Sequence, residues 1–136
     1  MNNLFDNYGT FSGRMLHVSP KETFELCSKG AVLVDVREEY LNSFKRFGVE
    51  KIIYLPKTKI EKDFAILPTK KYLIFTDSVG IHSKETVQFL QSKGYTKIAN
   101  MAGGIVEWER DGLPLIKDSG EQLSGSCLCQ LKKRKK

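Results

Sequence analysis

The feature that most constrains the fold is a series of short, unbroken apolar runs separated by segments with helical features. Runs of this length are too short for helices, and they are typical of strands that are covered on both faces, as in parallel sheets. The alternation of strand and helix therefore predicts an α/β domain with a central, mainly parallel sheet flanked by helices. The expected strands are 15–18 (at an edge of the sheet), 31–34, 52–55, 72–76 and 97–100.

Three helices are expected between and after these runs. The first covers 20–29, because Ser19 and Glu22 have the spacing of a capping box and Pro suits the first helical position. The second covers 83–93, and the third covers 104–110. Each expected helix is followed within two residues by a glycine, which is the usual residue just after a helix end.

Length and charge distribution predict one domain with a segment on either side. A chain of 136 residues suits a single domain. The net charge is +6, but residues 132–136 carry +5 of it, so 1–131 are nearly neutral. We expect 1–14 to be a flexible lead-in, 15–117 to be the domain, and 118–136 to be a flexible basic tail with two cysteines.

Composition also excludes several classes of protein. No apolar run reaches 18 residues, so neither a membrane span nor a membrane role is expected. The first residues lack the basic and apolar regions of a signal peptide, and three cysteines do not make a disulfide framework. These features predict a cytoplasmic protein. No aromatic residue is interleaved with the terminal basic run, so nucleic-acid binding is not expected.

The predicted ligand site is the loop between the strand at 72–76 and the helix at 83–93. Ligands of open α/β sheets bind beyond the carboxyl ends of the strands, against a helix N-terminus. A six-residue loop with a central glycine can point successive N–H groups inward and so form an anion cradle. An ordinary βα turn with a capping serine is the alternative. The loop residues are Asp77, Ser78, Val79, Gly80, Ile81 and His82.

Three segments, 34–38 (VDVRE), 72–84 and 103–114 (GGIVEWERDGLP), resemble the rhodanese (sulfurtransferase) domain family in composition, order and spacing. They are similar to that family's Asp-Val-Arg turn, to its active-site strand, loop and helix start, and to its Gly-Gly-Ile-x-x-Trp-x-x-x-Gly-Leu-Pro pattern. The resemblance spans residues 18–115, although 47–56 match less well. It implies the rhodanese-like fold, with a central, mainly parallel sheet flanked by helices.

The resemblance also implies a persulfide reaction, in which a loop cysteine takes a sulfane sulfur from a donor and passes it to a thiophilic acceptor. In this chain Asp77 stands at the nucleophile position, and His82 stands where the family commonly has Arg. A carboxylate cannot form a persulfide, would itself occupy the amide cradle, and would repel an anionic donor. We therefore predict a binding or regulatory module for an unknown protein partner or small ligand, without a cofactor or metal. Asp35 and Arg37 are expected beside the loop as a structural pair.

Other chemistries remain open at the loop and in the tail. Cys127 and Cys129 adjoin five basic residues, which favour thiolates, so a sulfurtransferase or sulfur-relay protein that uses them is the main alternative. Two thiolates do not complete a zinc site, and the cysteines of a solvated tail can be incidental. The Asp77 loop could also bind a cation or a cationic partner. Aspartyl-phosphate chemistry is not expected, because no acidic cluster accompanies Asp77.

Four further residues are assigned to the framework. Cys27 is expected to be a small core residue, and Trp108 is expected to pack the last helix onto the sheet. Gly103 and Gly104 are expected to allow a close approach of two backbone segments.

Overall fold

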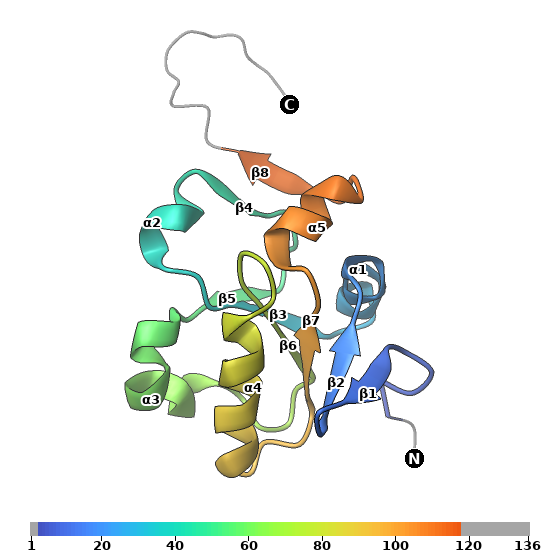
Figure 1. The fold of residues 1–136 in the computed structure, drawn as a ribbon, viewed down its shortest axis with the longest axis vertical. Helices are drawn as coiled ribbons and strands as arrows, with labels where there is room; N and C mark the ends of the chain where they lie inside the picture. The colour runs from blue at the N-terminus through green and yellow to red at the C-terminus, as the bar shows by residue number, and fades with distance from the viewer. Residues whose placement is uncertain (1–2, 118–136) are drawn as a thin grey trace, which may run out of the picture.

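The computed structural model describes residues 3–117, which form a six-stranded sheet with helices on both faces and a separate two-stranded sheet (Figure 1). Every neighbouring pair of strands in the larger sheet is parallel except the first pair, which is antiparallel. This sheet confirms the predicted α/β fold class. In spatial order its strands are β1 (Thr10–Ser12), β2 (Met15–Val18), β7 (Ile98–Met101), β6 (Leu73–Thr76), β3 (Val32–Asp35) and β5 (Ile52–Tyr54).

Two hydrophobic clusters, one on each face of the sheet, form the core. Neighbouring residues point to opposite faces, so Leu33 belongs to one cluster and Val34 to the other, and both are fully buried. Burial on both faces explains why these strands are continuous apolar runs. Helices α1 (Pro20–Ser28) and α5 (Gly104–Arg110) cover one face, and α3 (Ile60–Asp63) and α4 (His82–Ser92) cover the other.

Short elements complete the chain between and after the strands. The α1 N-terminus has the predicted capping box: the Glu22 amide donates to the Ser19 hydroxyl at 3.1 Å, and the Ser19 amide donates to the Glu22 carboxylate at 2.9 Å. The remaining elements are α2 (Glu39–Asn42), β4 (Lys45–Phe47), η1 (Lys57–Lys59), η2 (Phe64–Ile66) and β8 (Leu115–Lys117). Strands β4 and β8 pair antiparallel as the two-stranded sheet.

The N-terminal segment contains an element that the sequence did not predict. Residues 10–12, inside the expected lead-in 1–14, form β1 and pair with β2, so β2 is internal and not an edge strand. All three residues of β1 are exposed, so the strand is held by main-chain pairing and has no apolar pattern. Phe5, also in this segment, is buried in the core.

The boundaries of the expected strands and helices differ by at most one residue. The sequence did not predict α2, β4, η1, α3, η2 or β8. The helix expected over 83–93 begins and ends one residue earlier, and the strand expected over 97–100 is displaced by one residue towards the C-terminus. The helix expected over 104–110 is α5. The predicted tail, 118–136, lies outside the described residues. Within 3–117, none of the helices has the length and apolar character that a membrane span requires.

Candidate ligand site at the loop after β6

Strand β6 delivers Asp77 to the carboxyl edge of the sheet, where the following loop turns back on it. The Asp77 side chain is almost fully buried, with 2% of the residue exposed. Its Oδ2 atom accepts hydrogen bonds from the amides of His82 at 2.6 Å and Ser83 at 3.3 Å. Its Oδ1 atom accepts a hydrogen bond from the Gly80 amide. The loop therefore forms a ring of inward-pointing N–H groups, and the chain's own carboxylate occupies it.

The first turn of α5 holds the loop from the other side. The amides of Ile105 and Val106 donate to the carbonyl oxygens of Asp77 and Ser78, at 2.9 and 3.2 Å. A β-carbon on residue 104 would lie 2.4 Å from the Ser78 carbonyl, which no side chain could tolerate. The predicted close backbone approach at Gly104 is therefore confirmed.

A chain of buried polar groups fixes the loop from behind. The Ser83 hydroxyl donates to the Asn100 side-chain oxygen on β7 at 2.5 Å, and the Asn100 amide group lies 3.1 Å from Nδ1 of His17 on β2. Ser83 and Asn100 are both buried. Because buried polar groups are costly unless they are paired, these contacts favour one arrangement of the first turn of α4.

Asp35 and Arg37 form a buried ion pair at the carboxyl end of β3. The guanidinium donates to the carboxylate from Nε at 3.1 Å and from Nη2 at 2.9 Å, and the Arg37 amide donates to the same carboxylate at 3.0 Å. Arg37 also donates to the Asn42 side chain at 2.7 Å and to the Lys45 carbonyl at 2.8 Å. These contacts tie β3 to α2 and β4 and confirm the predicted structural pairing.

A cavity of about 550 Å³ opens beside the loop. It brings together four of the six predicted loop residues, together with Arg37, whereas Gly80, Ile81 and Asp35 do not line it. The other residues that line the cavity were not predicted from the sequence. Their position in the sequence could have indicated them, because they follow the carboxyl ends of β3 and β5, which meet β6 at the same sheet edge. The cavity is lined by Val36, Arg37, Glu38, Tyr40, Leu41, Lys57, Thr58, Asp77, Ser78, Val79 and His82.

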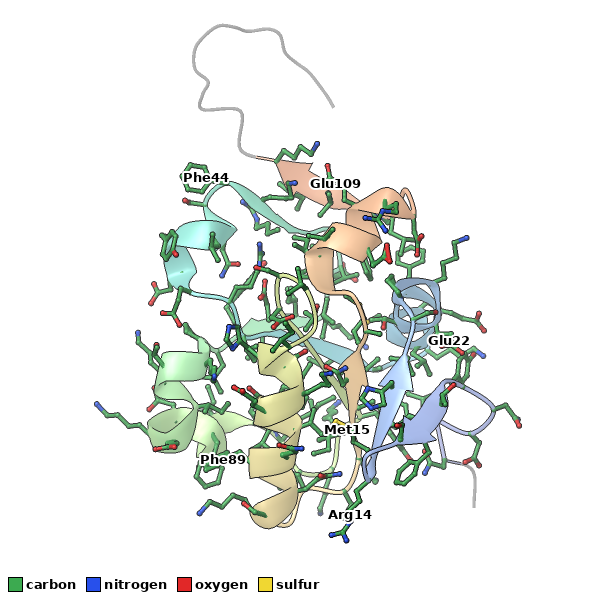
Figure 2. All side chains as sticks on the ribbon, in the orientation of Figure 1. Arg14, Met15, Glu22, Phe44, Phe89 and Glu109 are labelled. Atoms are coloured by element: carbon green, nitrogen blue, oxygen red, sulfur yellow. The ribbon has the colours of Figure 1, made fainter. Side chains whose placement is uncertain are left out.

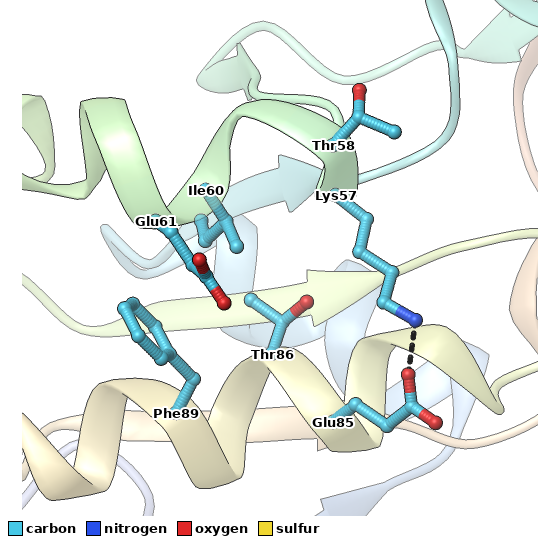
Figure 3. Close-up of a pocket in the computed structure, with 7 residues that line it drawn as sticks. All are labelled: Lys57, Thr58, Ile60, Glu61, Glu85, Thr86 and Phe89. Carbon is cyan, nitrogen blue, oxygen red and sulfur yellow. Dashed lines mark hydrogen bonds and ion pairs between the residues drawn. The ribbon is translucent and has the colours of Figure 1, made fainter.

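Lys57 and Thr58 line both this cavity and a second, neighbouring hollow of about 370 Å³ (Figure 3). The Lys57 ammonium is ion-paired with Glu85 and lies 3.2 Å from Nδ1 of His82. The same ammonium holds the pKa of the Glu85 carboxyl below its usual value. Figure 3 shows Lys57 reaching across from η1 to Glu85 on α4, with Glu61 and Phe89 farther along the hollow.

Cys27 lines neither cavity, and it is partly buried against the hydrophobic cluster on the other face of the sheet. Burial raises the pKa of the Cys27 thiol to about 11, so this residue is a poor source of thiolate at neutral pH. Trp108 is fully buried against Phe47, and its indole N–H donates to the Pro114 carbonyl at 2.7 Å, which confirms its packing role. Cys127 and Cys129 lie outside the described residues. Within 3–117, no group of three or more His, Cys, Asp or Glu is placed to hold a metal ion.

The arrangement limits what Asp77 can do. A carboxylate that already accepts three backbone hydrogen bonds and is almost fully buried has little capacity left for a cation or for attack on phosphorus. The adjoining cavity, in contrast, is open to a ligand. Its walls are apolar at Val36, Leu41 and Val79 and polar at the rim.

A mainly parallel sheet with an amide-lined loop at its carboxyl edge defines a class of α/β domains that hold an anionic group on backbone N–H donors. A model of the Rhodanese-like domain matches residues 19–111. The chain belongs to the rhodanese-like domain family.

Named relatives agree with this assignment at low identity. The chain is 26% identical over 99 residues to the thiosulfate sulfurtransferase GlpE of Actinobacillus pleuropneumoniae serotype 7, covering 72% of this chain and 90% of that protein. It is 25% identical over 93 residues to a sulfurtransferase of Allochromatium vinosum, covering 68% and 85% of the two chains. A rhodanese-related protein from Thermoplasma volcanium has a similar structure, with a TM-score of 0.67, 25% identity, and coverage of 74% of this chain and 96% of that one.

Proposed function

We propose that this rhodanese-like domain is a binding or regulatory module without thiosulfate sulfurtransferase activity at the loop after β6. The observation that carries the proposal is the Asp77 carboxylate, which accepts hydrogen bonds from the amides of Gly80, His82 and Ser83. In the persulfide reaction that the family resemblance implies, loop amides stabilise a charged sulfur. Here the same kind of donors are already used by a fixed side chain.

The chemistry of a carboxylate supports the same conclusion. Sulfur transfer through an enzyme persulfide needs a thiolate that attacks the sulfane sulfur and forms a sulfur–sulfur bond. A carboxylate has no sulfur atom and cannot form this bond. Asp77 also places negative charge where an anionic donor such as thiosulfate would approach. The Arg37 guanidinium does not offset this charge, because Asp35, Asn42 and Lys45 take its hydrogen bonds.

The cavity beside the loop supports a binding role. It has about 550 Å³, which is within the range of small-ligand sites, and it combines an apolar wall with a few polar groups. Tyr40 and Val79 at its mouth are 66% and 51% exposed, so a protein partner could also bury apolar surface there.

A thiosulfate:cyanide assay on the full chain tests the loss of activity. We expect no turnover from the natural sequence. We expect Asp77→Cys to gain one sulfur atom by intact mass after treatment with thiosulfate, because a thiolate would then replace the carboxylate on the amides. Asp77→Ser is the matched control and should gain none. Turnover by the natural sequence that is lost in Asp77→Ala would contradict the proposal.

The alternative is a sulfur relay through Cys127 or Cys129. It is favoured by the five basic residues beside them, which lower the cost of forming a thiolate. Treatment with a persulfide donor followed by peptide mapping separates the two functions. One added sulfur on the tail peptide, absent in Cys127→Ser/Cys129→Ser, would support the relay, and an unmodified tail would exclude it.

A further inference from the structure

We propose that residues 127–131 (CLCQL) of this same chain dock into the cavity beside the Asp77 loop, with the basic residues 132–136 against carboxylates at its rim. The inference rests on the proposed binding function, because it names the occupant of that site. The tail would then compete with any external ligand, and the domain would be regulated by its own C-terminal segment.

The described part of the chain ends close to the cavity. Lys117, its last residue, is the register partner of Lys45 on β4. The Lys45 carbonyl accepts a hydrogen bond from Arg37, which lines the cavity. The Lys117 and Lys45 ammonium groups also share the Glu109 carboxylate, at 2.8 and 2.5 Å. The chain therefore leaves the domain one strand away from a wall of the cavity.

The surface near the end of β8 carries an exposed apolar side chain. Phe44, which precedes β4, is 66% exposed, and it lies with Glu109 at the end of the molecule where β8 ends (Figure 2). Helix α2 follows the same side of the molecule and contributes Tyr40 and Leu41 to the cavity. Exposed apolar side chains are thus present near the exit of the chain, at Phe44, and at the cavity, at Tyr40 and Val79, where a leucine-containing segment would bury them.

The segment after Lys117 is long enough to reach the cavity. Crossing from β8 to β4 takes about 5 Å, and the four residues of α2 add about 6 Å. Cys127 is ten positions after Lys117, and a Gly/Ser-rich segment of that length has a root-mean-square span of about 17 Å. Tethering at this range gives effective concentrations on the order of millimolar, so even a weak contact would be populated.

The composition and charge of residues 127–136 suit the cavity and its surroundings. Residues 127–131 contain two leucines and two cysteines, which suit the apolar wall at Leu41 and Val79. The five basic residues follow directly. Beside them the cavity offers Glu38, and the neighbouring hollow offers Glu61 and Glu85 against the single ammonium of Lys57. The net charge of these groups is opposite in sign to that of the tail.

Disulfide trapping in the full chain tests the proposal. Val79→Cys places a thiol at the cavity mouth, and Cys129→Ser leaves Cys127 as the tail thiol. Oxidised glutathione accepts the two electrons and is reduced to two glutathione thiols as the intrachain disulfide forms. Peptide mapping scores the Val79→Cys–Cys127 linkage. Cys27 competes poorly, because burial raises its pKa to about 11.

Two controls correct for simple proximity. Arg110→Cys puts an exposed thiol on α5, a few residues before β8, and Phe11→Cys puts one on β1 at the far edge of the main sheet. Each rate is divided by the reactivity of the introduced thiol towards iodoacetamide. We expect trapping at position 79 to be about tenfold faster than at position 110, because docking raises the effective concentration of Cys127 at the cavity above that of a segment that is only tethered.

The apolar side chains of the tail should be required for trapping at position 79. The double substitution Leu128→Asp/Leu131→Asp should slow trapping at position 79 to the rate at position 110. Equal rates at 79 and 110, no effect of the double substitution, or disulfides only between two chains would overturn the proposal. Trapping requires no turnover, so its failure would not affect the proposal that the Asp77 loop lacks sulfurtransferase activity. Turnover at the loop, in turn, would contradict that proposal without changing the trapping result.

Discussion

Gly104 and Ser78 are in direct backbone contact: a β-carbon on residue 104 would lie 2.4 Å from the carbonyl of Ser78. The contact seats the first turn of α5 against the loop that carries Asp77, and the Ile105 amide then donates to the Asp77 carbonyl at 2.9 Å. The shape of the amide ring therefore depends on a residue that lies in a different segment and has no side chain.

Gly104→Ala should destabilise the fold by about 3 kcal/mol or more, because it adds a backbone clash to the cost of a left-handed conformation. Gly13→Ala is a matched control: φ is +58° at Gly13 and +60° at Gly104, but nothing lies within 4 Å of the added carbon at Gly13. That substitution should cost only about 1 kcal/mol. Urea unfolding measures both, and equal losses would show that the contact contributes nothing.

Breaking the buried Asp35–Arg37 pair should cost more than breaking an exposed one. Arg37→Met leaves a buried carboxylate without its cation, for which we expect a loss of about 3 kcal/mol. The double-mutant cycle with Asp35→Asn should give a coupling of about 2 kcal/mol. The same cycle at the exposed Glu39–Lys59 pair should give less than about 1 kcal/mol. Similar couplings in the two cycles would argue against a structural role for the buried pair.

Removal of the Asp77 carboxylate should loosen the loop. Asp77→Ala deprives the amides of Gly80, His82 and Ser83 of their acceptor, so their hydrogen exchange should accelerate by about tenfold, the effect of losing ~1.4 kcal/mol of local stability. Two-dimensional NMR follows each amide separately. Asp111→Ala, at an exposed helix end, is the control and should leave these three rates unchanged. Unaltered exchange in Asp77→Ala would mean that other contacts hold the loop.

The Cys27 thiol should make the fold less stable in alkaline solution. Burial raises its pKa from 9.0 to about 11, so the unfolded chain loses this proton before the folded one does. The stabilising contribution is complete below pH 9 and is lost as the pH rises through 11, with a maximum loss of about 3 kcal/mol. Unfolding curves at several pH values give the free energy of unfolding. Between pH 9 and 11 it should fall more steeply with pH for the natural chain than for Cys27→Ala. Parallel dependences would contradict the assignment.

Several features could be predicted from the sequence because they depend on neighbouring residues. The capping box at Ser19 and Glu22 uses groups three residues apart, and it forms as expected. The apolar runs around Leu33 and Ile74 predicted strands buried on both faces, since only a covered sheet tolerates such runs. The same local logic placed a loop between β6 and α4, expected at 77–82 and observed at 77–81 because α4 begins at His82.

Other features were decided only by the tertiary structure. Strand β1 has no apolar pattern, and it exists because β2 offers it main-chain partners. Lys57 and Tyr40 were not assigned to the site, although they share one cavity with Asp77. They meet there because parallel pairing aligns the carboxyl ends of β3, β5 and β6 at one edge. The sequence determined the apolar strands β2, β3, β5, β6 and β7 and the helices α1, α4 and α5. Long-range pairing decided which of their ends form the site, because register and crossover are properties of the assembled sheet.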